Sequence, residues 1–156
     1  MRLATIIALS MLVADQALKW FVVVGLDLAT RLHIAVLPPW FNLTMAWNRG
    51  VNFGLFAADS RWLPYALAAL ALVVAVWVWF WVRREGAPTG MQIAVGFLAG
   101  GAIGNAIDRL VWGAVADFLN VTCCGLVNPW AFNVADIAIF VGAFGLIVTS
   151  GGKKGA

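Results

Sequence analysis

The sequence predicts an all-α membrane protein with four transmembrane helices and a small β-sheet in the first loop outside the membrane. Apolar residues make up 63% of the 156 residues and charged residues only 11%, against about 45–50% and about 25% in soluble domains. A soluble chain of this length could not bury so much apolar surface. The net charge of +3 is not gathered into a basic face, so we expect no nucleic-acid partner.

The first apolar span covers residues 3–24, and two interpretations of it are open. Arg2 precedes an apolar run that ends at Ala14, as in a cleaved signal peptide. The apolar character resumes after Lys19, and the whole stretch reaches the length of about 20 residues that a membrane-crossing helix needs. We therefore expect the span to be retained. The other spans are residues 62–82, 91–112 and 132–150, and we expect residues 1–156 to form a single membrane domain.

Positive charges predict the side of the membrane on which each connection lies, because cytoplasmic loops carry an excess of lysine and arginine. The N-terminus, the second connection and the C-terminus carry such cations, namely Arg2, Arg83–Arg84 and Lys153–Lys154. Four spans place all three segments on one side, so both termini are expected in the cytoplasm. Residues 25–61 and 113–131 then lie outside.

The first outer loop is long enough to hold structure of its own. Residues 32–37 and 40–45 are strand-like, and Pro38–Pro39 marks a turn between them. A short amphipathic sheet on the membrane surface is the prediction for this loop.

Asp15 and Lys19 lie inside the first span, where a charge at the bilayer centre costs roughly 2.5–3.5 kcal/mol on insertion scales. They are four residues apart and share one helical face, with the acid first, as an ion pair prefers. Either they form a buried structural pair, or they line a polar site.

The third span carries a face of small residues that leads into polar ones. Glycines recur every four residues and would permit close helix approach. Three hydrogen-bonding side chains follow near the outer end of that face, and helix packing does not explain them. These residues are Gly96, Gly100 and Gly104, followed by Asn105, Asp108 and Arg109. The pattern indicates a polar cavity.

Asp117 and Asp136 lie at the outer boundary of the third and fourth spans, and nothing between them is charged. Two carboxylates at one apolar, partly wet place cannot both ionise easily, so they share a proton. An aspartic protease uses such a pair: one carboxylate takes a proton from water while its partner polarises the carbonyl. The alternative is two separate interfacial acids that cap helices.

Other kinds of active site find little support. His33 is the only histidine, which excludes zinc sites with the usual histidine set. Cys123 and Cys124 are adjacent, which suits neither a structural disulfide nor a CxxC redox pair. No GxSxG motif is present. A hydrolase built on this sequence would use its carboxylates.

Together these features resemble the lipoprotein signal peptidase family, also called signal peptidase II. The resemblance runs through five blocks in order along the chain. They are Asp15-Gln16-Ala17-Leu18-Lys19, Asn48-Arg49-Gly50-Val51-Asn52-Phe53-Gly54, the segment 100–109 that ends in Asn105-Ala106-Ile107-Asp108-Arg109, Val115-Ala116-Asp117-Phe118, and Phe132-Asn133-Val134-Ala135-Asp136. Residues 51–53 read Val-Asn-Phe where many relatives have two small residues before the phenylalanine.

The resemblance implies a multi-pass aspartic endopeptidase of the bacterial inner membrane that needs no metal or cofactor. Its substrates would be diacylglyceryl prolipoproteins, cut before the lipidated cysteine near the periplasmic face, and we expect it to act as a monomer in contact with membrane lipid. The catalytic pair would be Asp117 and Asp136. The substrate-binding and supporting residues would be Asp15, Lys19, Asn48, Asn105, Asp108, Arg109 and Asn133. Asp108 is expected to hold Arg109 or the helix end.

Two rival functions remain. A small proton- or ion-coupled transporter would use Asp15, Lys19, Asp108 and Arg109 as a relay, but it would spread its titratable groups through the membrane depth. A membrane assembly factor would use the glycine face to bind partners, and it would not need Asn105 and Arg109 beside that face.

Overall fold

The structure, a computed structural model, describes residues 1–50, 62–122 and 128–151. Several residues discussed above lie outside these ranges. They are residues 51–54 of the second family block, Cys123–Cys124 and Lys153–Lys154.

Four long helices form one bundle and confirm the prediction of four spans. They are α1 (Arg2–Trp20), continued by the π-helical turn η1 (Phe21–Gly25), and then α3 (Leu63–Arg84), α4 (Thr89–Val111) and α5 (Val134–Gly151). Within the described residues, these four are the helices long and apolar enough to cross a membrane. The chain is therefore a multi-pass membrane protein. A short helix, α2 (Leu28–Arg31), follows η1.

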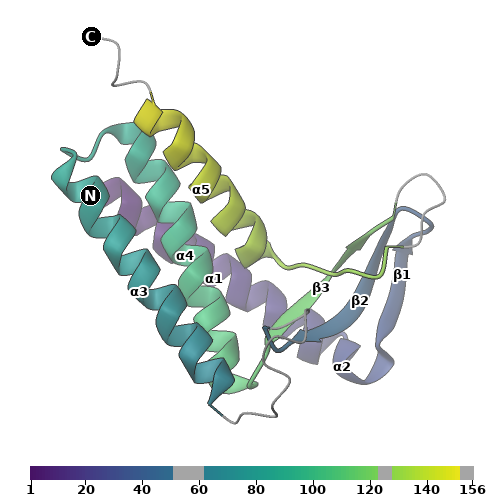
Figure 1. Ribbon diagram of the computed structural model, residues 1–156. Helices are drawn as coiled ribbons and strands as arrows, with labels where there is room; N and C mark the ends of the chain where they lie inside the picture. The colour runs from purple at the N-terminus through teal and green to yellow at the C-terminus, as the bar shows by residue number, and fades with distance from the viewer. Residues whose placement is uncertain (51–61, 123–127, 152–156) are drawn as a thin grey trace.

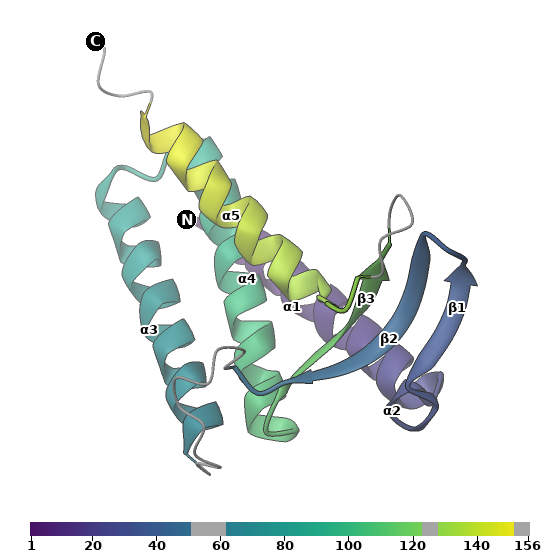
Figure 2. The same ribbon diagram turned by 45° about the vertical axis from the view of Figure 1, so that its right-hand side comes forward.

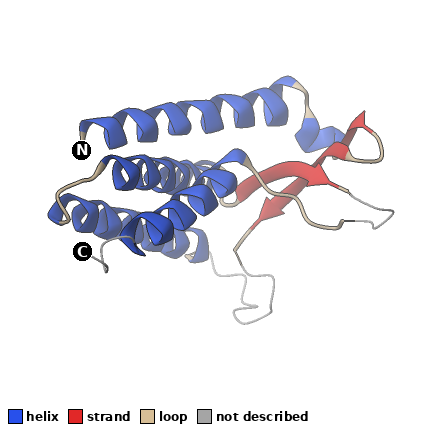
Figure 3. Cartoon of the chain, turned by 90° about the horizontal axis from the view of Figure 1, so that it is seen from above, coloured by secondary structure: helices blue, strands red, loops and turns tan. Residues whose placement is uncertain are grey.

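The ends of the bundle differ. Figure 1 shows the N-terminus and the far end of α5 together at one end, and the sheet at the other. Figure 3 shows the same separation from above, with the strands at the end of the molecule away from the two termini. We call these the terminal end and the sheet end. Proline and glycine shape the connection between α3 and α4: Gly86 has a φ of 79°, and Pro88 precedes the first residue of α4.

The sheet has three strands in the order β1 (His33–Leu37), β2 (Phe41–Asn48) and β3 (Val115–Val121), all antiparallel. The first two confirm the prediction of a small sheet in the loop between the first and second spans. The third was not expected, and it comes from the connection between α4 and α5. Its residues 115–118 are all buried, so β3 lacks the alternation of polar and apolar residues that reveals a half-exposed strand. In Figure 2, β3 and the start of α5 lie side by side.

Helix α4 is the centre of the bundle, and α1, α3 and α5 all pack against it. Glycines permit this close approach. A Cβ at Gly100 would lie 2.7 Å from the carbonyl oxygen of Ala8 on α1, and one at Gly101 would collide with the carbonyl oxygen of Ala135 on α5. The glycine face predicted for the third span therefore does pack against neighbouring helices, and Gly101 allows α5 an equally close approach on the adjacent face.

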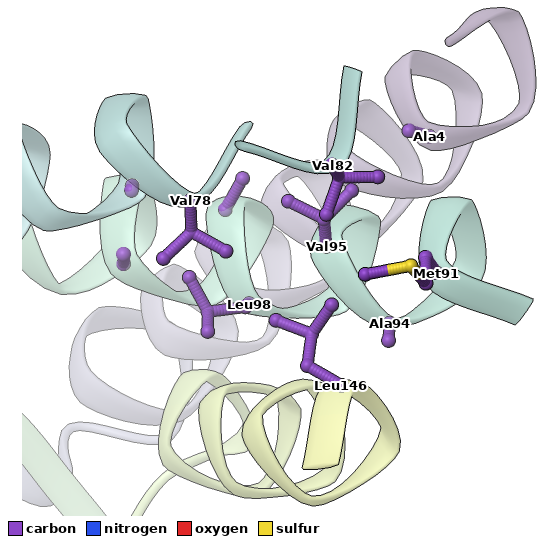
Figure 4. Packing of buried hydrophobic residues seen from close by; sticks show 11 residues of the cluster. Ala4, Val78, Val82, Met91, Ala94, Val95, Leu98 and Leu146 are labelled. Carbon is purple, nitrogen blue, oxygen red and sulfur yellow. The ribbon is translucent and has the colours of Figure 1, made fainter. Parts of the chain in front are cut away.

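The apolar core lies in the half of the bundle towards the terminal end. Figure 4 shows side chains from all four helices meeting there, with the side chains of α4 between the others. The labelled residues are Ala4, Val78, Val82, Met91, Ala94, Val95, Leu98 and Leu146. Buried polar residues gather instead towards the sheet end, as described next.

Candidate active site

Asp117 and Asp136 approach each other where β3 and the start of α5 meet. Asp117 lies in β3, opposite Ala46 of β2, and only 3% of it is exposed. Asp136 lies in the first turn of α5 and is partly buried. One residue, Asn133, bonds to both carboxyl groups. Its Nδ2 donates to Asp117 Oδ1 at 2.6 Å, and its backbone N–H donates to Asp136 Oδ2 at 3.1 Å.

Asn133 also begins the helix that carries Asp136. Its Oδ1 accepts the backbone N–H of Asp136 at 2.9 Å, while the Asp136 carboxylate accepts the backbone N–H of Asn133. This reciprocal pair has the geometry of a capping box, with an acid three residues after the capping residue. The sequence allowed Asp136 to be either a helix cap or one member of a carboxylate pair, and these two interpretations are compatible. Its carboxylate takes part in capping α5, and Asn133 bonds to this carboxylate and to that of Asp117.

Asn105 on α4 fixes the other side of Asp136. Its Nδ2 donates to Asp136 Oδ1 at 2.8 Å. Its Oδ1 accepts from Lys19 Nζ at 3.1 Å and from Asn133 Nδ2 at 3.3 Å. Because a lysine ammonium can only donate, Lys19 fixes which end of the Asn105 amide faces Asp136.

A buried ionic cluster lies behind this pair of asparagines. Lys19 Nζ bonds to Asp15 Oδ2 at 2.8 Å and to Asp108 Oδ2 at 2.7 Å, and all three side chains are at most 1% exposed. Gln16 Nε2 donates to Asp15 Oδ2 at 3.1 Å and to Asp108 Oδ1 at 3.0 Å. Asp15 and Lys19 thus form the ion pair that their spacing predicts, and Asp108 completes it.

Both carboxylates of this cluster also hold the backbone beside the paired aspartates. Asp15 Oδ1 accepts the N–H of Ala135 at 3.0 Å, and Asp108 Oδ2 accepts the N–H of Ala116 at 3.2 Å. Ala135 precedes Asp136 in the chain, and Ala116 precedes Asp117. One buried cluster therefore positions the two segments that carry the paired carboxylates.

Asn48 and Arg109 border the site from other directions. Asn48, the last residue of β2, donates from Nδ2 to Asp117 Oδ2 at 3.0 Å, and its Oδ1 accepts the N–H of Gly50. Arg109, near the end of α4, donates from one guanidinium nitrogen to the carbonyl oxygen of Asn105 at 3.2 Å. Its Nε is buried and has no hydrogen-bond partner among the described residues.

The environment of Asp117 changes its acidity. Burial raises the pKa of its carboxyl to about 7, and the nearby charge on Asp136 acts in the same direction. The hydrogen bonds from Asn48 and Asn133 oppose this rise only in part. A carboxyl whose pKa is raised towards neutral can both release and take up a proton at physiological pH.

The structure brings the residues singled out in the sequence into one place. Asp15, Lys19, Asn48, Asn105, Asp108, Asp117, Asn133 and Asp136 form one connected network, and Arg109 borders it. Asp108 was expected to hold Arg109 or the end of its helix. It bonds to Lys19, to Gln16 and to the N–H of Ala116, four residues after Trp112 at the end of α4. The contact with Ala116 corresponds to the second of these expectations. Sequence reasoning did not single out Gln16 as a site residue, although an amide inside an apolar span was a signal. Within the described residues, no group of three or more His, Cys, Asp or Glu side chains could hold a metal ion.

Comparisons with known proteins agree on one family. A model of the family described as "Signal peptidase (SPase) II" matches residues 7–151. The lipoprotein signal peptidase of Methylorubrum extorquens is 39% identical over 155 residues, covering 96% of this chain and 85% of that protein. The one from Rhodopseudomonas palustris is 37% identical, covering 96% and 92%.

Solved structures show the same fold. A bacterial membrane enzyme superposes with a TM-score of 0.72 at 26% sequence identity, covering 98% of this chain and 92% of that one. The site lies within the residues that the family model matches. This chain belongs to the signal peptidase II family and is a peptidase.

Proposed function

We propose that this chain removes the signal peptide from diacylglyceryl-modified bacterial prolipoproteins by cutting the peptide bond before the lipidated cysteine. Membership of the family and the name lipoprotein signal peptidase, carried by its relatives, support this substrate. The observation that carries the chemistry is the shared Asn133, which bonds to the carboxyl groups of both Asp117 and Asp136. Two acids held in this way are suited to activate one water molecule between them.

The two carboxyl groups take different parts in the proposed reaction. Asp136 accepts two N–H donors, from Asn105 and from the Asn133 backbone, and we assign it as the base that takes a proton from water. Asp117, with a pKa of about 7, supplies a proton to the carbonyl oxygen as the hydroxyl adds to the carbon. When the tetrahedral intermediate collapses, that oxygen returns its proton to Asp117. Asp136 then passes its proton to the departing nitrogen, which restores both groups.

Arg109 and Asn48 would orient the substrate or the acids. The buried Nε of Arg109 has no hydrogen-bond partner among the described residues, and a substrate carbonyl that reached it on binding would supply the missing acceptor. Asn48 holds Asp117 from the sheet side. Lys19, Asp15 and Asp108 would act from behind, through Asn105 and the backbone of Ala135 and Ala116.

The proposed side of the membrane follows from the charges at the terminal end. Arg2, Arg83 and Arg84 lie there, and cations favour the cytoplasmic side. The sheet end and the paired carboxylates would then face the periplasm at the surface of the inner membrane. A substrate with acyl chains in the outer leaflet would present its scissile bond at that depth.

Asparagine variants at the two acids test the proposal. Asp117→Asn and Asp136→Asn should each lower the rate of cleavage of a purified diacylglyceryl prolipoprotein by about 10²–10⁴-fold, the range for a lost acid or base. Asp27→Asn is the matched control, since Asp27 is exposed and lies outside the network; it should cleave at the wild-type rate. The thermal unfolding of each variant in detergent shows whether it is folded. Wild-type cleavage by either folded site variant would refute the assignment of that acid.

A precursor without its diacylglyceryl group tests the substrate. It should remain uncut under conditions in which the lipidated precursor is fully processed. Equal cleavage of the two precursors would refute the proposed lipid requirement while leaving the role of the acids intact.

A further inference from the structure

An apolar groove runs along the face of α4 opposite the paired aspartates. Helices α1 and α3 both pack on α4 and leave a cavity of about 360 Å³ between them. Its lining is almost entirely apolar: Thr5, Ala8 and Leu9 from α1, Leu72, Ala75, Val76, Trp79 and Phe80 from α3, and Ala99 and Ile103 from α4. On α4, Ala99 and Ile103 lie on a different helical face from Gly101 and Asn105, which face α5. The groove is thus separate from the candidate active site.

The length of the groove fits one leaflet. From Leu72 to Phe80 the α3 wall rises by eight residues, or about 12 Å at 1.5 Å per residue. The hydrocarbon core of a bilayer is about 30 Å thick, so one leaflet contributes about 15 Å. Leu9, Val76 and Phe80 are each more than half exposed, which leaves the groove open to the membrane.

Arginines continue both walls of the groove at the terminal end. On α1, Arg2 precedes Thr5 by three residues and Leu9 by seven, so it shares their helical face. On α3, Arg83 follows Trp79 by four residues, and Arg84 follows Phe80 by four. All three arginines are exposed. Both rows belong to helices that pack against α4, and Ala4 and Val82 beside them are part of one apolar core cluster.

The charge at this end selects among possible occupants. Among the described residues there, Glu85 is the one acid beside the three arginines, so the end is positively charged. The basic n-region of a signal peptide would be repelled by it. A second copy of this chain would bring the same arginines to the same place. An anionic lipid suits both the apolar groove and the arginines at its end. Its acyl chain is apolar, and basic positions between transmembrane helices bind anionic headgroups.

We infer that the groove between α1 and α3 binds an anionic phospholipid of the leaflet at the terminal end. One acyl chain lies along Leu9, Val76 and Phe80, and the phosphodiester contacts Arg2, Arg83 and Arg84. In a bilayer the apolar groove alone would not distinguish one lipid from another, because every lipid offers the same acyl chain. The arginines supply the preference for a negative headgroup.

Native mass spectrometry of the full chain in detergent tests this site. The protein is titrated with dioleoylphosphatidylglycerol or dioleoylphosphatidylcholine, and the first bound lipid is quantified. The wild type should bind the anionic lipid more tightly. Arg2→Gln, Arg83→Gln and Arg84→Gln should each reduce that preference by about fivefold, which corresponds to about 1 kcal/mol per cation near a headgroup. Arg31→Gln, an exposed cation on α2 at the sheet end, is the charge control and should change nothing.

Substitutions that fill the groove with a larger side chain test whether an acyl chain binds in it. Val76→Trp should abolish tight binding of the anionic lipid, and Leu9→Trp should do the same from the α1 wall. Val74→Trp is the matched control. Val74 lies two residues away, about 200° round the helix, and it is 44% exposed. All three variants should retain prolipoprotein cleavage, which separates this site from the proposed active site.

Three results would overturn the inference. They are an unchanged lipid preference when all three arginines are replaced together, wild-type binding by both groove-filling variants, and a dimer mass that Val76→Trp abolishes. The last would assign the groove to a second copy of the chain.

Discussion

Lys19 is the only cation in contact with the two buried carboxylates of Asp15 and Asp108 in the described structure, at 2.8 Å and 2.7 Å. Lys19→Met removes the ammonium and keeps a side chain of similar length. Two carboxylates that are at most 1% exposed would then face each other without a counter-charge. Breaking a buried pair in this way costs about 3–5 kcal/mol of unfolding free energy. For a chain of this size, that corresponds to a fall in Tm of roughly 6–20 °C.

A triple variant separates the effect of charge from that of backbone contacts. Lys19→Met/Asp15→Asn/Asp108→Asn removes every charge of the cluster together. Each asparagine still carries an oxygen that can accept the N–H of Ala135 or Ala116. We therefore expect the triple variant to recover at least half of the Tm that the single variant loses, and to regain part of its cleavage activity.

Thermal unfolding in detergent, followed by intrinsic tryptophan fluorescence, measures both effects. Asp27→Asn serves as the control for an exposed charge and should lie within about 0.5 kcal/mol of the wild type. A Lys19→Met variant with wild-type Tm would show that the cluster is not a charge-balanced unit. A triple variant no more stable than the single one would show that unbalanced charge is not what destabilises Lys19→Met.

Three further predictions concern the site itself. Cleavage should fall as pH rises above about 7, because Asp117 must be protonated and its pKa is raised to about 7; an activity that keeps rising to pH 9 would contradict its role as the acid. Asn48→Ala removes a hydrogen bond that lowers this pKa, so the falling limb of the pH–rate profile should move to higher pH, and movement to lower pH would contradict the assignment. A Cβ at Gly104 would lie 2.5 Å from Asp15 Oδ2, so Gly104→Ala should lower stability by about 1–3 kcal/mol and slow cleavage. Gly151→Ala, with open space around it, should do neither in the same unfolding and cleavage assays.

The pattern of apolar residues was enough to predict the spans. The predicted limits 62–82, 91–112 and 132–150 differ by at most two residues from α3 (Leu63–Arg84), α4 (Thr89–Val111) and α5 (Val134–Gly151). Helix length and apolar composition are local properties, and the thickness of the bilayer constrains them directly.

The strand β3 could not be predicted in the same way. Its residues 115–118 are buried by neighbours far away in sequence, including Leu43 of β2, which belongs with Phe118 to one apolar cluster. Nothing in the run Val-Ala-Asp-Phe distinguishes such a strand from the end of a helix, because its context decides its conformation. As a result, the sequence placed Asp117 just beyond the third span, where the structure has it, but gave no sign that it lies in a strand.

The partners of the polar residues also lay beyond the sequence pattern. The spacing of Asp15 and Lys19 predicted their ion pair, because four residues make one turn of a helix. Their contacts with Asp108 and Asn105 join helices more than 80 residues apart in the chain, and no local rule gives such a contact. The hydrogen bonds from the backbone N–H groups of Ala135 and Ala116 could not be predicted for a further reason. The identity of a residue as alanine does not indicate whether its N–H donates to a side chain.

The free-energy cost of burying this ionic cluster indicates that its role is not simply structural. Replacing a buried ion pair with apolar side chains of similar size is often neutral or stabilising, so Asp15, Lys19 and Asp108 are not needed simply to hold α1 against α4. Glycines at 96 and 100 already bring the two helices together. The cluster adds acceptors for the N–H groups of Ala135 and Ala116 and a donor that orients Asn105. These three contacts fix Asp136 from two sides and Asp117 from one, and apolar side chains could provide none of them. Its specific effect should therefore be seen in the rate of cleavage by variants that remain folded, such as the triple asparagine and methionine variant, more than in Tm.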